Sequence, residues 1–168
     1  MTTVNGLPAH ILLVHAIVVL LPLSALLLVL SALWPAARAK LAGPNAILSV
    51  LVVILVPITT DAGEWLERRV ARTPLVRTHT ELGDTAIWVA LPVAVLALLV
   101  WWRRRETGRS GRTFLAPAST AVTVVVAVLS IAAAGAAVFD IYRIGDSGAQ
   151  ATWQGQFGSA PAGGDSDG

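Results

Sequence analysis

The fold is decided by the stretch from Ile11 to Trp34, which reads ILLVHAIVVLLPLSALLLVLSALW. It contains no Asp, Glu, Lys or Arg, and a helix of this length, rising about 1.5 Å per residue, crosses the roughly 30 Å hydrocarbon layer of a bilayer. Three further runs without charged residues follow at 41–60, 85–102 and 113–139. The chain therefore has four segments with the length and composition of membrane-spanning helices.

The composition of the whole chain also indicates a membrane protein. Of its 168 residues, 55% are hydrophobic and 13% are charged, and a water-soluble domain of this size could not bury so much apolar surface. The four runs lack the alternation of barrel strands, which leaves helices as the way to satisfy the backbone in lipid. We predict an all-α integral membrane four-helix bundle in one domain, 1–154, and a disordered external tail, 155–168. The predicted spans are 11–34, 44–61, 84–102 and 119–140.

The basic residues predict how the bundle is oriented in the membrane. The first and third connections between spans carry Lys and Arg with a single acid, whereas the second mixes basic with acidic residues. The basic residues of the first and third connections are Arg38, Lys40, Arg103, Arg104, Arg105, Arg109 and Arg112, and those of the second are Arg68, Arg69, Arg72 and Arg77. Because Lys and Arg concentrate in cytoplasmic loops, we expect both termini on the non-cytoplasmic side (N-out, C-out).

Residue content argues against several functions. The chain has no cysteine, which excludes disulfides, thiolate metal sites and cysteine nucleophiles. We find no nucleophile elbow, phosphate-binding glycine loop, zinc-binding histidine pair of the HExxH type or catalytic triad pattern, so we do not expect an enzyme. The net charge of +2 comes from Arg residues on the connections, where they act as orientation signals, so we expect no nucleic-acid partner.

The three histidines are the main indication of function, because all of them fall on the predicted external side. His10 and His15 lie at the start of the first span, and His79 precedes the third. Imidazole binds metals and haem and exchanges protons near neutral pH, so we take His15, His79 and His10 as candidate cofactor ligands. On a regular helix His10 and His15 point about 140° apart and cannot share one centre. His15 has the strongest claim, since it lies deeper, where a polar ring needs a partner; a hydrogen bond to a neighbouring helix is the alternative.

Asp61 and Glu64 are the candidate ligands for a hard metal cation. They lie on one helix face if the second span continues outward, and carboxylate oxygens suit hard cations. The competing interpretation is a salt-bridged surface helix, because Glu64 and Arg68 form a favourable i, i+4 pair.

Local patterns predict three further features. A helix should start just before His79, with Thr78 or Thr80 as its N-cap. The segment 145–148, Gly-Asp-Ser-Gly, predicts a turn before a short outer helix. The small residues at 130–137 allow another helix to approach closely, either within the bundle or in a dimer.

Four pieces of sequence are distinctive when taken together. They are LPAHILLVH (7–15), DAGEWLERRV (61–70), HTELGD (79–84) and RIGDSGAQATW (143–153). Over about residues 6–155 the chain resembles the bacterial four-span membrane family named domain of unknown function 2231. The resemblance implies a multi-pass protein of the bacterial plasma membrane with its signature residues on the external face. It also implies a connection to electron transfer, because some relatives look to be joined to Rieske iron-sulfur or cytochrome modules.

Three functions follow from these observations as hypotheses. The first is a binding module whose external histidines and carboxylates hold a metal ion or haem and serve a redox complex. The second is a structural or assembly subunit of a membrane complex without a cofactor. The third is a small transporter or proton-handling protein, against which stands the lack of charged residues at the bilayer centre.

Overall fold

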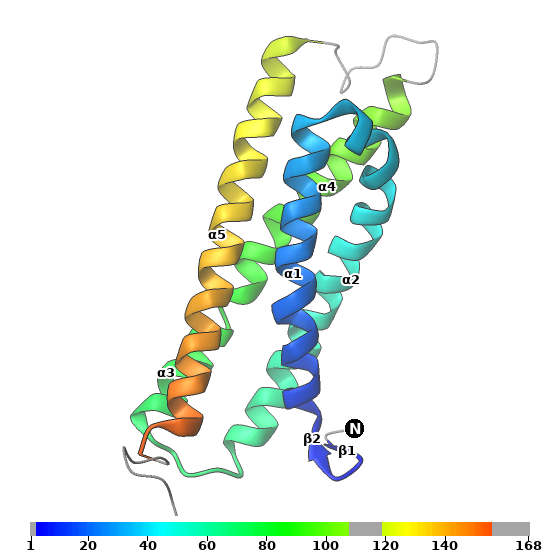
Figure 1. Cartoon of the computed structure of the whole chain (residues 1–168). Coiled ribbons are helices and arrows are strands. Elements are labelled where there is room, and N and C mark those ends of the chain that lie inside the picture. Colours follow the sequence, from blue (N-terminus) through cyan, green and yellow to red (C-terminus); the bar gives the residue numbers. More distant parts are fainter. Residues whose placement is uncertain (1–2, 108–118, 156–168) are drawn as a thin grey trace, which may run out of the picture.

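The computed structural model describes residues 3–107 and 119–155, which form a bundle of helices (Figure 1). Its elements in chain order are β1 (Thr3–Val4), β2 (Leu7–Pro8), α1 (Ala9–Leu33), α2 (Pro35–Glu67), α3 (Pro74–Gly83), α4 (Ala86–Thr107) and α5 (Thr120–Trp153). The predicted all-α bundle is therefore confirmed, with a small antiparallel hairpin added before α1. Figure 1 shows that α1 begins and α5 ends at the same end of the bundle.

The outer surface of the bundle is apolar on all four long helices. Val19, Ile47, Val95 and Val125, one from each helix, are 61%, 74%, 61% and 55% exposed. Only 22% to 33% of the most apolar 18-residue window of each candidate span is buried inside the bundle. In water such a surface would be strongly unfavourable, whereas lipid chains solvate it. The chain is thus a membrane protein with four helices long and apolar enough to span a bilayer.

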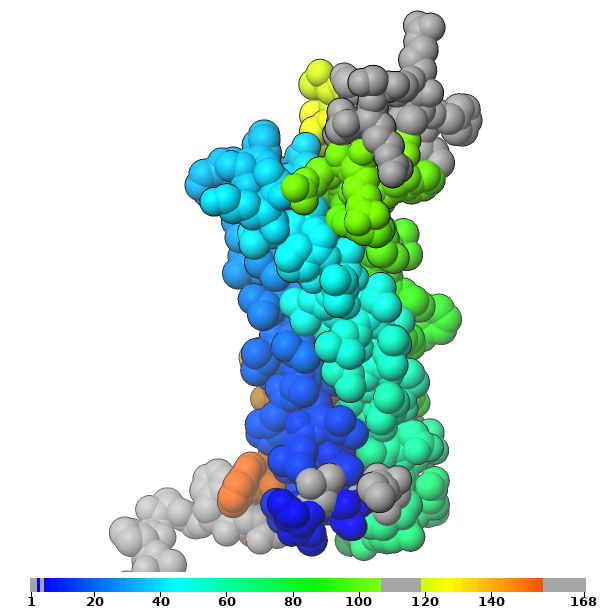
Figure 2. Space-filling model, turned by 90° about the vertical axis from the view of Figure 1, so that its right-hand side faces the viewer, coloured from blue at the N-terminus to red at the C-terminus, as the bar shows by residue number. Residues whose placement is uncertain are grey.

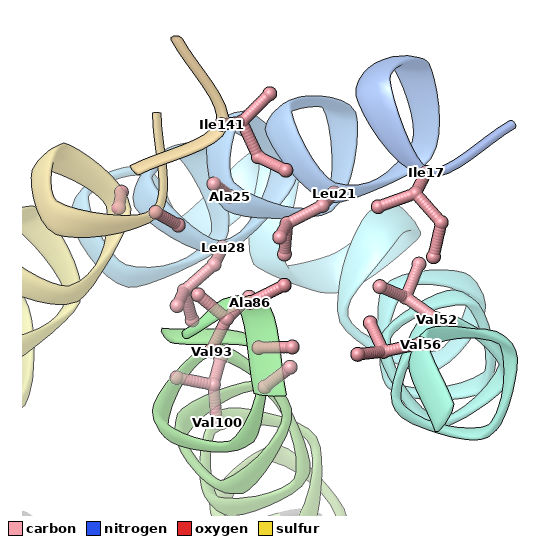
Figure 3. Close-up of a cluster of buried hydrophobic side chains, with 14 of the residues drawn as sticks. Ile17, Leu21, Ala25, Leu28, Val52, Val56, Ala86, Val93, Val100 and Ile141 are labelled. Carbon is pink, nitrogen blue, oxygen red and sulfur yellow. The ribbon is translucent and has the colours of Figure 1, made fainter. Parts of the chain in front are cut away.

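A narrow apolar core runs along the middle of the bundle (Figure 3). Each long helix contributes one stripe of residues to it, and in α1 and α4 these residues are spaced three or four positions apart, as helix geometry requires. Leu21 and Leu28 of α1, Val52 of α2 and Val93 of α4 are at most 1% exposed. Figure 2 shows α1 and α2 side by side along the length of the bundle.

The turn between α1 and α2 is a single residue, Trp34, because Pro35 has no amide hydrogen and starts the next helix. Arg38 stabilises this turn from α2. Its Nε donates to the Ser31 carbonyl at 2.8 Å, and its Nη2 donates to the Ala32 carbonyl. These carbonyls end α1 and have no helical amide to accept from.

Two helices extend beyond the ends of their predicted spans, which were residues 61 and 140. α2 continues outward to Glu67, and α5 continues to Trp153 without a break. The turn predicted at 145–148 is wrong, because the Ser147 hydroxyl donates to the Ile144 carbonyl inside a continuous helix. The predicted tail begins with Gly155, which has a φ of 80°, and its remaining residues, 156–168, lie outside the described ones.

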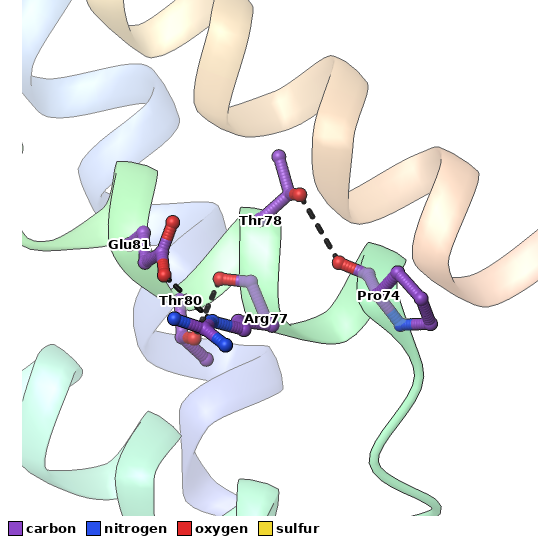
Figure 4. A network of polar contacts seen from close by, with 5 residues as sticks. All are labelled: Pro74, Arg77, Thr78, Thr80 and Glu81. Atoms are coloured by element: carbon purple, nitrogen blue, oxygen red, sulfur yellow. Dashed lines mark hydrogen bonds and ion pairs between the residues drawn. The ribbon is translucent and has the colours of Figure 1, made fainter.

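The short helix α3 also starts earlier than predicted. Its N-cap is Thr73, whose hydroxyl accepts from the Val76 amide at 3.2 Å, so the expected caps Thr78 and Thr80 lie inside the helix. Their hydroxyls instead donate back to backbone carbonyls, and Arg77 pairs with Glu81 at 2.8 Å (Figure 4). No residue of α3 is fully buried, so the helix lies along the edge of the bundle.

Candidate functional site

His10 lies in the first turn of α1 and contacts α2. Its Nδ1 is 3.0 Å from the carbonyl oxygen of Thr59. Because a carbonyl only accepts hydrogen bonds, Nδ1 carries the proton and donates, which assigns the tautomer from the partner. Nε2 of His10 is then the ring nitrogen with a lone pair.

His79 is held in the same way by α5. Its Nδ1 is 3.1 Å from Ser147 Oγ. The Ser147 hydroxyl donates its only hydrogen to the Ile144 carbonyl at 2.9 Å, so Ser147 Oγ accepts from His79 Nδ1. Nε2 of His79 is therefore also left with its lone pair.

Each imidazole lies against a glycine of the neighbouring helix. A Cβ added at Gly63 of α2 would be 2.9 Å from Cε1 of His10, and a Cβ added at Gly148 of α5 would be 2.9 Å from Cε1 of His79. Such distances are too short for real carbon atoms. Any other residue at either position would thus displace the ring, so the two glycines create the slots that hold the rings.

The two rings meet at the end of the bundle where α1 begins and α5 ends. Their centres are 6.3 Å apart, with an angle of 74° between the ring planes. Both rings line a pocket of about 50 Å³ that also receives Thr59 and Thr60. The rest of its lining is mostly apolar and includes Val14, Ile17, Val56, Ala86, Ile141 and Ile144. The two imidazole rings therefore form a polar edge of a pocket that is otherwise mostly apolar.

The structure leaves the other predicted site residues away from this pair. His15 is exposed, and its Nδ1 is bonded to the Ile11 carbonyl of its own helix. Glu64 forms the expected pair with Arg68 at 3.6 Å, and Asp61 is exposed. Within residues 3–107 and 119–155, no three His, Asp or Glu side chains gather closely enough to hold a metal ion. The ligand roles of His15, Asp61 and Glu64 stay predictions.

The same helix that holds His79, α5, also carries a buried carboxylate. Asp140 of α5 is 6% exposed, and both of its oxygens are 2.9 Å from the hydroxyl of Thr85, at the junction of α3 and α4. No ion pair of Asp140 occurs in the described part of the chain. This contact ties α5 to the junction of α3 and α4.

Sequence patterns pointed to His10 and His79 but not to the residues that hold them. Thr59, Gly63, Ser147 and Gly148 make the site; the sequence placed Thr59 inside the second span, Gly63 just beyond it, and Ser147 and Gly148 in a predicted turn. The usable signal was the glycine in each of two otherwise helical outer segments, because an isolated helical glycine often marks close packing.

Taken together, the fold and the histidine pair define a four-span α-helical membrane protein with a two-imidazole pocket at one end. A family profile described as "Predicted membrane protein (DUF2231)" matches residues 6–161. The chain belongs to this family, which confirms the resemblance seen in the sequence. Among curated proteins no match was found, and the same holds for solved structures.

Proposed function

We propose that this protein is a membrane binding module that holds a transition-metal ion between His10 and His79. The observation that carries the proposal is the pairing of the two rings, 6.3 Å apart, with both Nδ1 atoms already occupied. Metal-binding histidines commonly donate one ring N–H to a carbonyl or another acceptor while the other nitrogen binds the metal. Thr59 and Ser147 supply this support here.

An ion bound by both rings requires the two Nε2 atoms to point towards a common centre, and a ring separation of 6.3 Å leaves room for one ion there. Metal–nitrogen bonds of about 2.0–2.1 Å on each side, added to the ring radii, give a centre-to-centre distance on the order of 6 Å. Two imidazoles leave further coordination positions open, which water or a partner group would fill. Imidazole ligands suit zinc, copper, iron and nickel; copper or iron would connect the site to electron transfer.

The size of the pocket favours an ion over haem. The hollow beside the rings measures about 50 Å³, whereas pockets for organic ligands are typically 300–1,000 Å³. We therefore propose a bound ion with water, located on the external face of a bacterial plasma membrane and presented to a redox complex. The proposed role is binding, with no catalytic step.

An assembly role without a cofactor is the second candidate. It rests on the small-residue stretch of α5, which the structure divides between two faces. Ser130, Ala134 and Ala137 are buried in the bundle, whereas Ala132 and Ala136 are exposed towards the lipid. Small residues on a lipid-facing helix surface allow another helix to pack closely.

Metal titration of the purified protein separates the two candidates. The detergent-purified chain is stripped with a chelator and titrated calorimetrically with copper, zinc or iron. We expect one ion per chain, with affinity lost in His10→Ala and in His79→Ala but retained in the matched control His15→Ala. No binding by the wild type, or equal binding by all variants, would reject the site and favour the assembly role.

A further inference from the structure

One end of the bundle carries a large excess of positive charge. It is the end where α1 turns into α2, α4 ends and α5 begins (Figure 1), and we call it the basic end. Residues 34–40 and 103–119 of the sequence contain seven basic residues and one acid, Glu106. No other Asp or Glu occurs from Met1 to Thr60 or from Thr85 to Phe139. The basic residues near this end therefore have almost no carboxylates with which to form ion pairs.

Arg38 is half-buried at the basic end and still has hydrogen-bond donors to offer. Its Nε and Nη2 donate to the Ser31 and Ala32 carbonyls that end α1, and these two bonds fix the direction of the guanidinium group. Its Nη1 carries two further N–H groups, which have no partner in the part of the chain that the structure describes. The guanidinium is thus oriented by the protein and free to bind another acceptor.

Arg103 of α4 is a second half-buried arginine at the basic end. Its Nη2 donates to Thr123 Oγ1 of α5 at 3.3 Å, so a neighbouring helix holds this group too. A Cβ added at Gly43 of α2 would lie 3.4 Å from the indole nitrogen of Trp101, which shows how closely α2 and α4 pack at this level. Arg103 lies just outside the predicted third span, and burial together with the positive charge of Arg38 lowers its pKa. The two guanidinium groups therefore lie near each other.

Two positive charges held near each other repel. An arginine stays protonated at any physiological pH, so the protein cannot relieve the repulsion by releasing a proton. An anion bound between the two groups would offset it. The planar guanidinium group matches the oxygens of a phosphate, to which it can donate two parallel hydrogen bonds. The arginine pair is thus suited to a phosphate group.

The level of the pair in the membrane indicates where this phosphate comes from. Trp34 lies four residues before Arg38, and Trp102 directly precedes Arg103. The two tryptophans are 62% and 44% exposed, and exposed tryptophan is typical of the headgroup level of a bilayer. The phosphates of phospholipids lie at this level, and basic pockets between membrane helices bind such headgroups.

We propose that the basic end binds the phosphate group of an anionic phospholipid between Arg38 and Arg103. The acyl chains then lie along the apolar outer surface of the bundle, where Leu33 and Leu98 are 56% and 38% exposed. A zwitterionic lipid brings a positive charge of its own and suits the site less well. The site lies at the opposite end of the bundle from the histidine pocket, so it does not depend on metal binding.

Native mass spectrometry of the delipidated full-length protein in detergent tests the proposal. We expect phosphatidylglycerol to bind at least about tenfold more tightly than phosphatidylcholine, because hydrogen bonds to a net negative group are the stronger ones. Inorganic phosphate, added at the same concentration as the lipid, should not displace phosphatidylglycerol. Equal affinity for the two lipids, or displacement by inorganic phosphate, would overturn the proposal.

Substitutions at the basic end test where the lipid binds. Arg38→Gln and Arg103→Gln each remove one guanidinium group, and Arg103→Gln keeps the test informative if Arg38→Gln, which alters the α1–α2 turn, does not fold. We expect the affinity for phosphatidylglycerol to fall about tenfold or more in each folded variant. Arg105→Gln is the matched control, because it removes one positive charge from the same end, yet Arg105 lies over the ring of Trp101, 4.3 Å from its centre. An equal loss in all the variants would mean diffuse attraction and would overturn the site.

Discussion

The imidazole rings of His10 and His79 lie 6.3 Å apart in an edge-to-face arrangement, although one ring begins α1 and the other belongs to α3. Neither ring is held by its own helix. Thr59 of α2 fixes one and Ser147 of α5 fixes the other. The pair therefore depends on the mutual packing of four helices, which makes it sensitive to changes at positions that never touch a ligand.

Replacing Gly63 should weaken metal binding without changing either histidine. In Gly63→Ala the new methyl group would lie 2.9 Å from Cε1 of His10, so the ring must turn and its bond to Thr59 is lost. Loss of such a supporting contact typically lowers metal affinity about 10- to 100-fold, and calorimetric titration measures it. Gly145→Ala is the matched control, since a Cβ there would meet no atom of another described helix within 4 Å. Equal affinities in the two variants would contradict the role of the slot.

Replacing Ser147 should disturb His79 alone. Ser147→Ala removes the oxygen that accepts from Nδ1, so the ring loses its fixed tautomer and orientation. We expect an affinity loss of about 10- to 100-fold, as for other supporting partners. Thr152→Ala is the control on the same helix, because the Thr152 hydroxyl is exposed and donates to the Gly148 carbonyl of its own helix. An unchanged affinity in Ser147→Ala would show that Ser147 does not position the ring.

The contact between Thr85 and Asp140 should contribute to stability. The Thr85 hydroxyl lies 2.9 Å from both carboxylate oxygens and 2.6 Å from the Leu82 carbonyl, and its one hydrogen is shared among these acceptors. Thr85→Val removes this donor and leaves buried acceptors unpaired. The expected loss is about 1–3 kcal/mol, which thermal or denaturant unfolding in detergent measures. Thr78→Val serves as the control, since its hydroxyl is exposed and bonds within α3. A loss no larger than in this control would mean that Asp140 has another partner.

Cysteine labelling tests the predicted orientation, because the natural chain contains no cysteine. Thr73 and Lys40 are both exposed. Thr73 caps α3, at the end of the bundle where α1 begins, and Lys40 lies in the first turns of α2, at the opposite end. With both termini outside, a membrane-impermeant thiol reagent added to intact cells should label Thr73→Cys and leave Lys40→Cys unlabelled until the membrane is opened. The reverse pattern would place the histidine pair on the cytoplasmic side.

The membrane spans could be predicted from the sequence because lipid imposes a simple rule, a run of about 20 residues without charge. That rule does not predict at which residue a helix ends once it has left the lipid. α2 and α5 continue to Glu67 and Trp153 because these outer turns pack against His10 and α3, and packing partners are not visible in a hydropathy pattern.

The candidate site was predictable only in part. The helical angle between His10 and His15 correctly indicated that the two rings face different directions. It did not indicate which of them meets His79, because that choice depends on the register of α1 against α2. We favoured His15 as a ligand because its deeper position predicted a buried ring. The ring is instead exposed, and it bonds within its own helix.

The most direct test is the metal content of protein purified from its native membrane without added metal. Elemental analysis gives the number of ions per chain for the wild type, His10→Ala, His79→Ala and His15→Ala. We expect about one transition-metal ion in the wild type and in His15→Ala, and none in the other two; the metal should also be released in acid, where protons compete for Nε2. A metal-free wild type, or an ion lost only in His15→Ala, would contradict a site built on His10 and His79.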